Sequence, residues 1–303
     1  MHSRSSGWFE ANRLFLLASP REAMPNPDVA AGAPPPKRSR FSLDKCPKPC
    51  ATPCKLPDLS DLTQDVKTLP APPGVRETLQ GSTSFVAIDC ETHALVPRGA
   101  SPSFWRPGEF GFLTTADDVV LSSLRLVQIG WAYVPEGAHA PVVKHRLIKP
   151  EAFVVEDSAT AKHGITHASA LSHGKALGEG LRELLRDVTA LVNKGYRICG
   201  HHLGFDAGII LRELGRAHLG DSAGTWEQMA REGLCTMDPD ICHWVRKQIG
   251  LADKPRSIPM RLRDLITILL PQHAQLVAQN HHAGVDAHMH VLLAQELRRR
   301  AVS

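Results

Sequence analysis

The chain has 303 residues, of which 43% are hydrophobic and 22% charged, and its formal net charge is +4. This length allows one large domain or two small ones, and the hydrophobic fraction is ordinary for a globular protein. No stretch approaches the roughly 20 apolar residues of a membrane span, so we expect no membrane partner. The basic excess is too small to indicate a nucleic-acid partner by itself.

The first quarter of the chain differs in composition from the rest. Thirteen of the 23 prolines precede residue 81. Proline removes backbone hydrogen-bond donors and interrupts both helices and strands, and a segment this rich in it buries little apolar surface. We therefore predict a disordered, proline-rich extension over residues 1–79 and one folded domain over residues 80–303, which begins near Gly81.

Two short segments of this extension are candidate targeting signals. Residues 1–23 contain three arginines, several serines and only two acids, a weak match to an organelle transit peptide. Residues 37–40 read Lys-Arg-Ser-Arg, a weak match to a nuclear signal. The seven cysteines are odd in number, which fits a reducing compartment. We expect an intracellular protein, located in the nucleus or in an organelle.

The cysteines fall into two groups. Three of them are spaced four residues apart among prolines, and we interpret them as unpaired surface thiols, because zinc sites normally use four ligands. The other four lie in or beside apolar runs, which is typical of small buried residues. The first group is Cys46, Cys50 and Cys54, and the second is Cys90, Cys199, Cys235 and Cys242.

Alternating patterns of strands and helices follow in the second part of the chain. Runs of apolar and β-branched residues predict strands, and apolar residues at helical spacing predict helices. The predicted strands are 85–88, 124–134, 142–148 and 195–200, and the predicted helices are 177–191, 205–214, 261–270 and 285–300. Residues 93–117 are rich in proline and glycine and predict a long surface loop. This order of elements predicts an α/β domain with a mixed sheet.

The first predicted strand ends in two carboxylates, Asp89 and Glu91. Side chains alternate between the two faces of a strand, so these two should project from the same face. Two like charges held this close resist joint ionisation unless a cation lies between them. The pair therefore indicates a site for a hard divalent metal ion, although two solvated acids at a strand end would give the same pattern.

Two further acids lie where helices begin. Asp206 follows a predicted strand at the start of a predicted helix, which is where α/β folds place ligand chemistry. Asp286 opens the last predicted helix and is preceded by His281 and His282. For each aspartate alone, the ordinary interpretation is a helix cap.

In combination, these motifs resemble the DEDDh family of 3′–5′ exonucleases, with an exonuclease domain similar to the proofreading subunit of bacterial replicative polymerases. The resemblance covers about residues 84–300 and includes segments near residues 159–166 and 234–237. It is carried by three motifs in order: Ile88-Asp89-Cys90-Glu91-Thr92, His201-His202-Leu203-Gly204-Phe205-Asp206, and His281 five residues before Asp286. The family implies a ribonuclease H-like fold, with a central mixed five-stranded sheet flanked by helices.

The resemblance also implies a chemistry. Asp89, Glu91, Asp206 and Asp286 would bind two Mg²⁺ ions, for which Mn²⁺ can substitute, since hard oxygen ligands favour these metals. His281 would act as the general base. The substrate would be DNA or RNA with a free 3′ end, single-stranded, and the products nucleoside 5′-monophosphates. The predicted substrate contacts adjoin the motifs and are Thr92, His202 and Phe205.

Two rival interpretations stay open at this level. The histidine-rich stretch from His281 to His290 could serve a zinc-dependent hydrolase, but His288 and His290 would point about 200° apart on a helix and could not then share one ion. The other rival is a catalytically inactive nucleic-acid-binding module of the same fold. The presence of all five expected acidic and histidine residues argues against inactivity.

Overall fold

The computed structural model describes residues 69–81, 84–96, 120–251 and 260–302. The predicted targeting segments and the first three cysteines lie outside these ranges, as does most of the predicted 93–117 loop. The other four cysteines are buried and unpaired, as their apolar neighbours predict. Among the described helices, none has both the length and the apolar character needed to cross a membrane.

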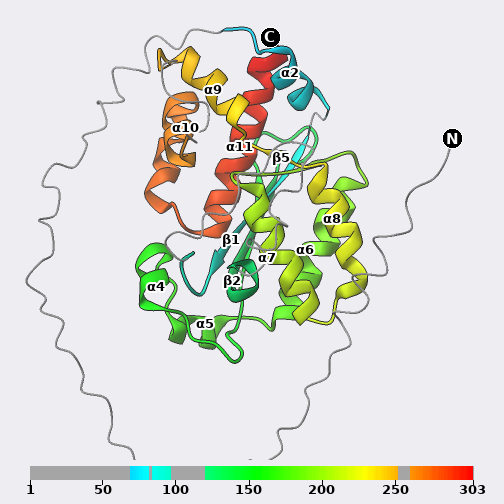
Figure 1. The fold of residues 1–303 in the computed structure, drawn as a ribbon, viewed down its shortest axis with the longest axis vertical. Helices are drawn as coiled ribbons and strands as arrows, with labels where there is room; N and C mark the ends of the chain where they lie inside the picture. Colours follow the sequence, from blue (N-terminus) through cyan, green and yellow to red (C-terminus); the bar gives the residue numbers. More distant parts are fainter. Residues whose placement is uncertain (1–68, 82–83, 97–119, 252–259, 303) are drawn as a thin grey trace, which may run out of the picture. The chain divides into compact units, whose positions relative to one another are not determined.

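A mixed five-stranded sheet forms the centre of the domain (Figure 1). Its strands are β1 (Phe85–Thr92), β2 (Leu126–Tyr133), β3 (Val142–Leu147), β4 (Arg197–Gly200) and β5 (Leu234–Cys235). The spatial order is β3-β2-β1-β4-β5, with β1–β2 and β2–β3 antiparallel and β1–β4 and β4–β5 parallel. The predicted α/β class and the mixed five-stranded sheet are confirmed.

Helices cover both faces of the sheet. One face carries α6 (Leu177–Val192), α7 (Leu203–Arg216) and α8 (Ala223–Arg231), whose apolar residues pack on those of β1 and β2. The other face carries α11 (Ala283–Val302) together with α2 (Pro73–Gln80), α9 (Pro239–Gln248) and α10 (Leu262–Leu269). The short helices α4 (Asp157–His163) and α5 (His167–His173) connect β3 to α6, and the 3₁₀ segments are η3 (Gly220–Ser222) and η4 (Pro271–Gln279).

The strand β1 decides which face receives the acidic pair. Val86, Ile88 and Cys90 belong to the core beneath α6 and α7, whereas Phe85 and Ala87 belong to the core beneath α11. Because side chains alternate along a strand, Asp89 and Glu91 share the α11 face with Phe85 and Ala87.

All the predicted strands and helices are present, and their ends agree within two residues with one exception. The exception is β1, which continues past Ile88 to Thr92, so that both acids lie inside the ladder. Asp89 pairs with Gly130 of β2, and Glu91 pairs with Gln128. The apolar run alone did not reveal that polar residues extend the strand.

The folded domain begins earlier than residue 80. Helix α2 buries Val75 and Leu79 in the core shared with α11, and Trp244 of α9 donates its indole N–H to the Leu69 carbonyl at 3.1 Å. Residues 69–79 therefore belong to the domain and not to the extension. The proline content was misleading here, because Pro73 occupies the first position of the helix, where the missing N–H costs nothing.

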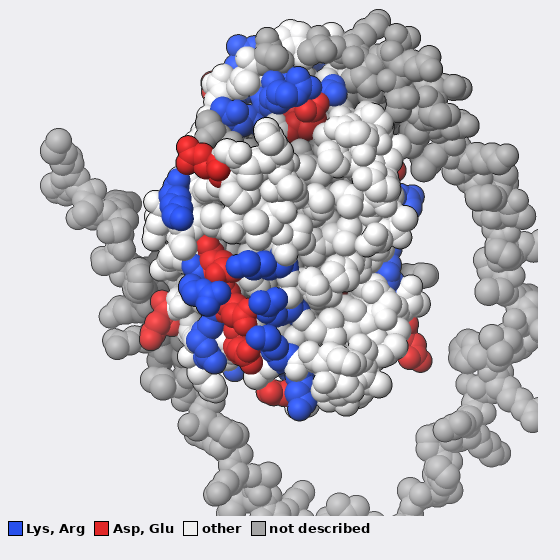
Figure 2. Space-filling model, turned by 180° about the vertical axis from the view of Figure 1, so that it is seen from behind, with Lys and Arg blue, Asp and Glu red and all other residues white. Residues whose placement is uncertain are grey.

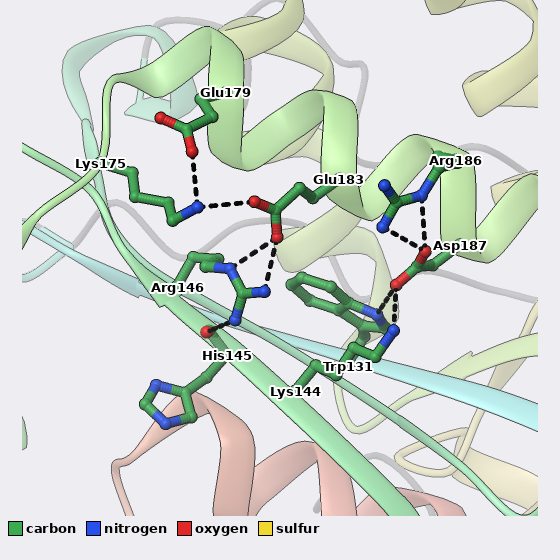
Figure 3. Close-up of polar contacts among 9 residues, drawn as sticks. All are labelled: Trp131, Lys144, His145, Arg146, Lys175, Glu179, Glu183, Arg186 and Asp187. Carbon is green, nitrogen blue, oxygen red and sulfur yellow. Dashed lines mark hydrogen bonds and ion pairs between the residues drawn. The ribbon is translucent and has the colours of Figure 1, made fainter.

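A network of paired charges joins α6 to β3 (Figure 3). Glu183 accepts hydrogen bonds from Arg146 at 2.6 Å and from Lys175 at 2.7 Å. Asp187 accepts from Lys144 at 2.7 Å and from the Trp131 indole at 3.2 Å. On the face seen from behind, acidic and basic side chains are likewise interleaved in one area (Figure 2).

Candidate active site

Asp206 is fixed to β1 and does not cap its own helix. It lies in the first turn of α7, is 3% exposed, and its Oδ1 accepts the backbone N–H of Cys90 at 2.9 Å. The residue before the helix, His202, has a left-handed backbone with φ 72° and ψ 43°, and it makes no side-chain cap. This hydrogen bond holds the second acidic motif directly against the first.

Asp286 and His281 form one unit at the start of α11. The backbone N–H of His281 donates to Asp286 Oδ2 at 3.0 Å. One donor atom each from Glu91, His281 and Asp286 lie within 4.8 Å of one another. Asp286 thus binds the chain that leads into its helix, as a capping residue would, and at the same time faces the acids of β1.

The four predicted carboxylates and His281 line one cavity of about 600 Å³. His202 and Phe205 line it too, with their rings nearly parallel at 16° and their centroids 6.0 Å apart. Thr92, the third predicted substrate contact, is buried and donates its hydroxyl to the Ala94 carbonyl at 2.8 Å. Three basic side chains also line this cavity: Lys162, Arg261 and Arg263.

The carboxylates of the cavity repel one another. Burial raises the pKa of Asp89 well above its ordinary value, and the charges of Asp206, Asp286 and Glu91 raise it further. Burial, followed by the charge of Asp286, raises the pKa of Glu91 to about 8 against the opposing effect of Lys162. Burial raises the pKa of Asp286 to about 7, although the His281 N–H acts to lower it. Burial also raises the pKa of Asp206.

This donor set fits a hard divalent cation. Four carboxylates gathered in a partly buried cavity destabilise their ionised forms, and a cation between them removes that cost. Glu91 and Asp286 are oxygen donors close enough to share one ion, and Asp89 and Asp206 extend the oxygen-rich floor. Oxygen donors of this kind suit Mg²⁺ and Mn²⁺.

Sequence reasoning missed two residues that fix the position of α11. Gln128 is 1% exposed, its Oε1 accepts the Ala283 N–H at 2.8 Å, and its Nε2 lies 3.2 Å from a ring nitrogen of His282. At Gly130, a Cβ atom would lie 2.2 Å from the Ala283 carbonyl carbon. A glutamine in an otherwise apolar strand and a glycine two residues later were the available signals.

His290, named above only as part of the rival zinc cluster, lies against Asp89 itself. Its Nε2 is 3.9 Å from Asp89 Oδ1, and its Nδ1 is 3.1 Å from the Ile88 carbonyl oxygen. Burial lowers the pKa of His290 to about 4. Its position four residues after Asp286, one helical turn away, was the signal in the sequence.

The other histidines of the 281–290 stretch point elsewhere. The ring of His282 packs against that of His145 on β3, with centroids 4.6 Å apart. Burial lowers the pKa of His288, and the charge of His273 in η4 lowers it further. Because α11 begins at Ala283, the predicted helix is confirmed, and His288 and His290 lie on different sides of it. A zinc site built from both is therefore not formed.

Comparison with known proteins finds neighbours among solved structures. No protein-family model and no curated protein matches the chain. Escherichia coli exonuclease I in complex with a dA16 oligonucleotide is 14% identical, with a TM-score of 0.45 over 72% of this chain and 42% of that one. The zinc-bound E. coli exonuclease I complex with single-stranded DNA is 16% identical, with a TM-score of 0.46 over 72% and 41%.

A third neighbour is exonuclease I from Methylocaldum szegediense, 19% identical, with a TM-score of 0.47 over 73% of this chain and 41% of that one. The chain thus spans about two fifths of the length of these neighbours. Similarity of this degree assigns neither an activity nor a substrate to the chain.

Proposed function

We propose that the protein is a metal-dependent 3′–5′ exonuclease that hydrolyses phosphodiester bonds of single-stranded DNA or RNA. The observation that carries this proposal is the meeting of four carboxylates and one histidine, from β1, α7 and the start of α11, in a single cavity. Structural acids are normally paired with cations or solvated, whereas these are partly or fully buried beside one another. An arrangement so unfavourable without a cation is typical of a catalytic metal centre.

The four carboxylates would act as metal ligands. Asp89, Glu91 and Asp286 would hold one Mg²⁺ or Mn²⁺ ion, and Asp206 with Asp89 a second. Bound divalent ions supply positive charge to the phosphodiester and lower the pKa of water in the site. The carboxylates would hold these ions in the cavity, within reach of a substrate phosphate.

His281 would accept the proton of the attacking water. Burial lowers its pKa, and the positive charge of Lys162 lowers it further, which favours the neutral form of the ring. A neutral imidazole has a free lone pair and can act as a general base. The water oxygen forms a bond to phosphorus, the bond to the 3′ oxygen of the preceding nucleotide breaks, and that oxygen takes up a proton from solvent.

The wall of the cavity supports a nucleic-acid substrate. The parallel rings of His202 and Phe205 offer an aromatic surface on which a terminal base could stack. Lys162, Arg261 and Arg263 place cations around an acidic floor, where the phosphates of the chain would lie. We keep DNA and RNA as alternatives, because the choice depends on how the cavity treats the 2′-hydroxyl.

The test uses the full chain with matched DNA and RNA oligonucleotides carrying a 5′ label. With Mg²⁺ or Mn²⁺, we expect a ladder that shortens from the 3′ end and release of nucleoside 5′-monophosphates, both abolished by EDTA. The Asp89→Ala protein is the control for contaminating nucleases. Binding of every oligonucleotide without release of mononucleotides would instead favour the inactive binding module of the same fold.

A further inference from the structure

His290 occupies an unusual position for a buried histidine. It lies on α11 one turn after Asp286, lines the same cavity, and is 1% exposed. Its Nδ1 lies 3.1 Å from the Ile88 carbonyl oxygen, and its Nε2 lies 3.9 Å from Asp89 Oδ1. One ring nitrogen is therefore bound to the β1 backbone while the other faces the central carboxylate of the site.

The contact with Ile88 decides which nitrogen carries the proton. A carbonyl oxygen can only accept a hydrogen bond, so Nδ1 must donate it. In the neutral ring, Nε2 then presents a lone pair, and this lone pair faces a carboxylate oxygen. Two electron-pair donors that face each other repel, unless a cation lies between them.

The neighbouring His201 shows the ordinary state of a buried histidine in this protein. Its ring centroid lies 6.2 Å from that of His290. Its Nε2 donates to the Met260 carbonyl at 2.9 Å, and its Nδ1 lies 3.0 Å from the Thr236 hydroxyl, whose proton can turn either to Nδ1 or to the Gly200 carbonyl 3.3 Å away. Both nitrogens of His201 have complementary partners, whereas Nε2 of His290 faces another acceptor.

We propose that His290 Nε2 is a ligand of the divalent cation held by Asp89, and that this nitrogen gives the site a preference for Mn²⁺ over Mg²⁺. Metal–ligand distances of about 2.1 Å allow two donors up to about 4.2 Å apart to share an ion, which accommodates the observed separation. Imidazole suits borderline transition metals, while Mg²⁺ favours oxygen donors alone. The inference rests on the metal-dependent exonuclease proposed above and adds a metal preference to it.

The test measures Mn²⁺ binding to the full chain by electron paramagnetic resonance, without nucleic acid. His290→Asn is the informative variant, because its amide can still donate to the Ile88 carbonyl but does not reach the position of Nε2. We expect it to weaken Mn²⁺ binding about 10- to 100-fold, as loss of a metal-site interaction does, and to reduce the preference for Mn²⁺ over Mg²⁺ in competition at least about tenfold. His288→Asn, on the far side of the same helix, is the matched control and should change neither.

Electron spin echo modulation of the bound Mn²⁺ then reports nitrogen coordination directly. Since His281 also lies near Glu91 and Asp286, the measurement is made in the His281→Ala protein. Nitrogen modulation should persist there and disappear when His290→Asn is added. Absence of nitrogen modulation from the His281→Ala protein would overturn the proposal, and so would its survival in the double variant. The first of these two outcomes does not depend on whether His290→Asn folds.

The two proposals fail in different ways. If the protein binds Mn²⁺ and releases mononucleotides, but the bound Mn²⁺ shows no nitrogen modulation from His290, the proposed exonuclease activity is retained and the proposed histidine ligand is refuted. If the wild-type protein binds neither Mn²⁺ nor Mg²⁺, both proposals are refuted.

Discussion

Two clusters of acidic side chains in this protein show opposite electrostatic behaviour. On the α6 side, Glu183 and Asp187 lie among lysines and arginines (Figure 3). In the cavity on the α11 side, Asp89, Glu91 and Asp286 lie mainly among other acids. Both clusters join a helix to the central sheet, so the difference comes from the partners of the acids.

The shifts in pKa record this difference. A hydrogen bond from Lys175 lowers the pKa of Glu183. Burial acts to raise the pKa of Asp187, but hydrogen bonds from Lys144 and Arg186 outweigh it and leave the pKa below its ordinary value. In the cavity, burial and like charge act together, and the pKa of Glu91 rises to about 8. The acids of the α6 network are paired with cations of the chain, whereas those of the cavity face one another, as expected of the metal site proposed above.

The largest expected effect is that of removing the central acid of the cavity. Asp89→Ala should lower mononucleotide release below detection, because it removes the carboxylate that both metal positions would share. The conservative Asp89→Asn should also be inactive, yet in EDTA it should melt above the wild type, since it removes one charge from a repelling cluster. Unimpaired activity of Asp89→Ala would refute the assignment of the site.

His281→Ala should be the next most severe change. Loss of the general base is expected to reduce the turnover number about 10²- to 10⁴-fold. His282→Ala is the matched control, because its side chain contacts Gln128 and His145 and not the acids. Single-turnover rates on one oligonucleotide measure both, and equal losses would show that the wrong histidine was assigned.

Gly130→Ala should act through the position of α11. The added Cβ would lie 2.2 Å from the backbone of Ala283, so the start of the helix must move away from β2 and carry His281 and Asp286 with it. We expect a loss of about 1–3 kcal/mol in the free energy of unfolding and about 10- to 100-fold in activity. The control is Gly215→Ala on α7, where a Cβ meets nothing within 4 Å; a similar loss there would contradict this explanation.

The acids of the cavity should make the stability of the protein depend on pH. Folding raises the pKa of Glu91 from 4.5 to about 8 and that of Asp286 from 3.8 to about 7. A group whose pKa is raised by folding stabilises the folded state below its unfolded pKa, and this contribution disappears as the pH rises toward the folded value. In EDTA, the melting temperature should therefore fall between about pH 4 and 8.

Saturating Mn²⁺ should flatten this fall, because a bound cation compensates the ionised carboxylates and binds the folded state. Thermal melts at several pH values, with and without the metal, measure the effect. Equal slopes of melting temperature against pH in EDTA and in Mn²⁺ would mean that the cavity acids do not bind a cation.

The smallest expected effect is in the α6 network. Glu183→Gln breaks ion pairs with Arg146 and Lys175 that are partly exposed, so it should cost less than about 1 kcal/mol and less still in high salt. Exonuclease activity should be unchanged. A loss of activity similar to that of a cavity variant would mean that the two clusters are not independent.

Part of the candidate site could be predicted from the local order of the sequence. Asp89 and Glu91 share a face because strands alternate, and His281 and Asp286 meet because both lie at the start of one helix. The extent of α2 and β1 was harder to read. A proline can begin a helix, and a strand can continue through charged residues when its neighbours pair with them.

The sequence by itself determined the α/β class and the order of the elements, since each follows from a short-range pattern. The five residues at the centre of the cavity were predicted from the resemblance of three ordered motifs to a known family. Only the tertiary structure revealed the roles of Gln128 and His290, which contact Ala283 and Ile88 across 155 and 202 residues of chain. It also decided which acids are paired with bases and which face one another. A carboxylate looks the same in either cluster until folding sets its neighbours, because those neighbours and the surrounding burial determine its charge.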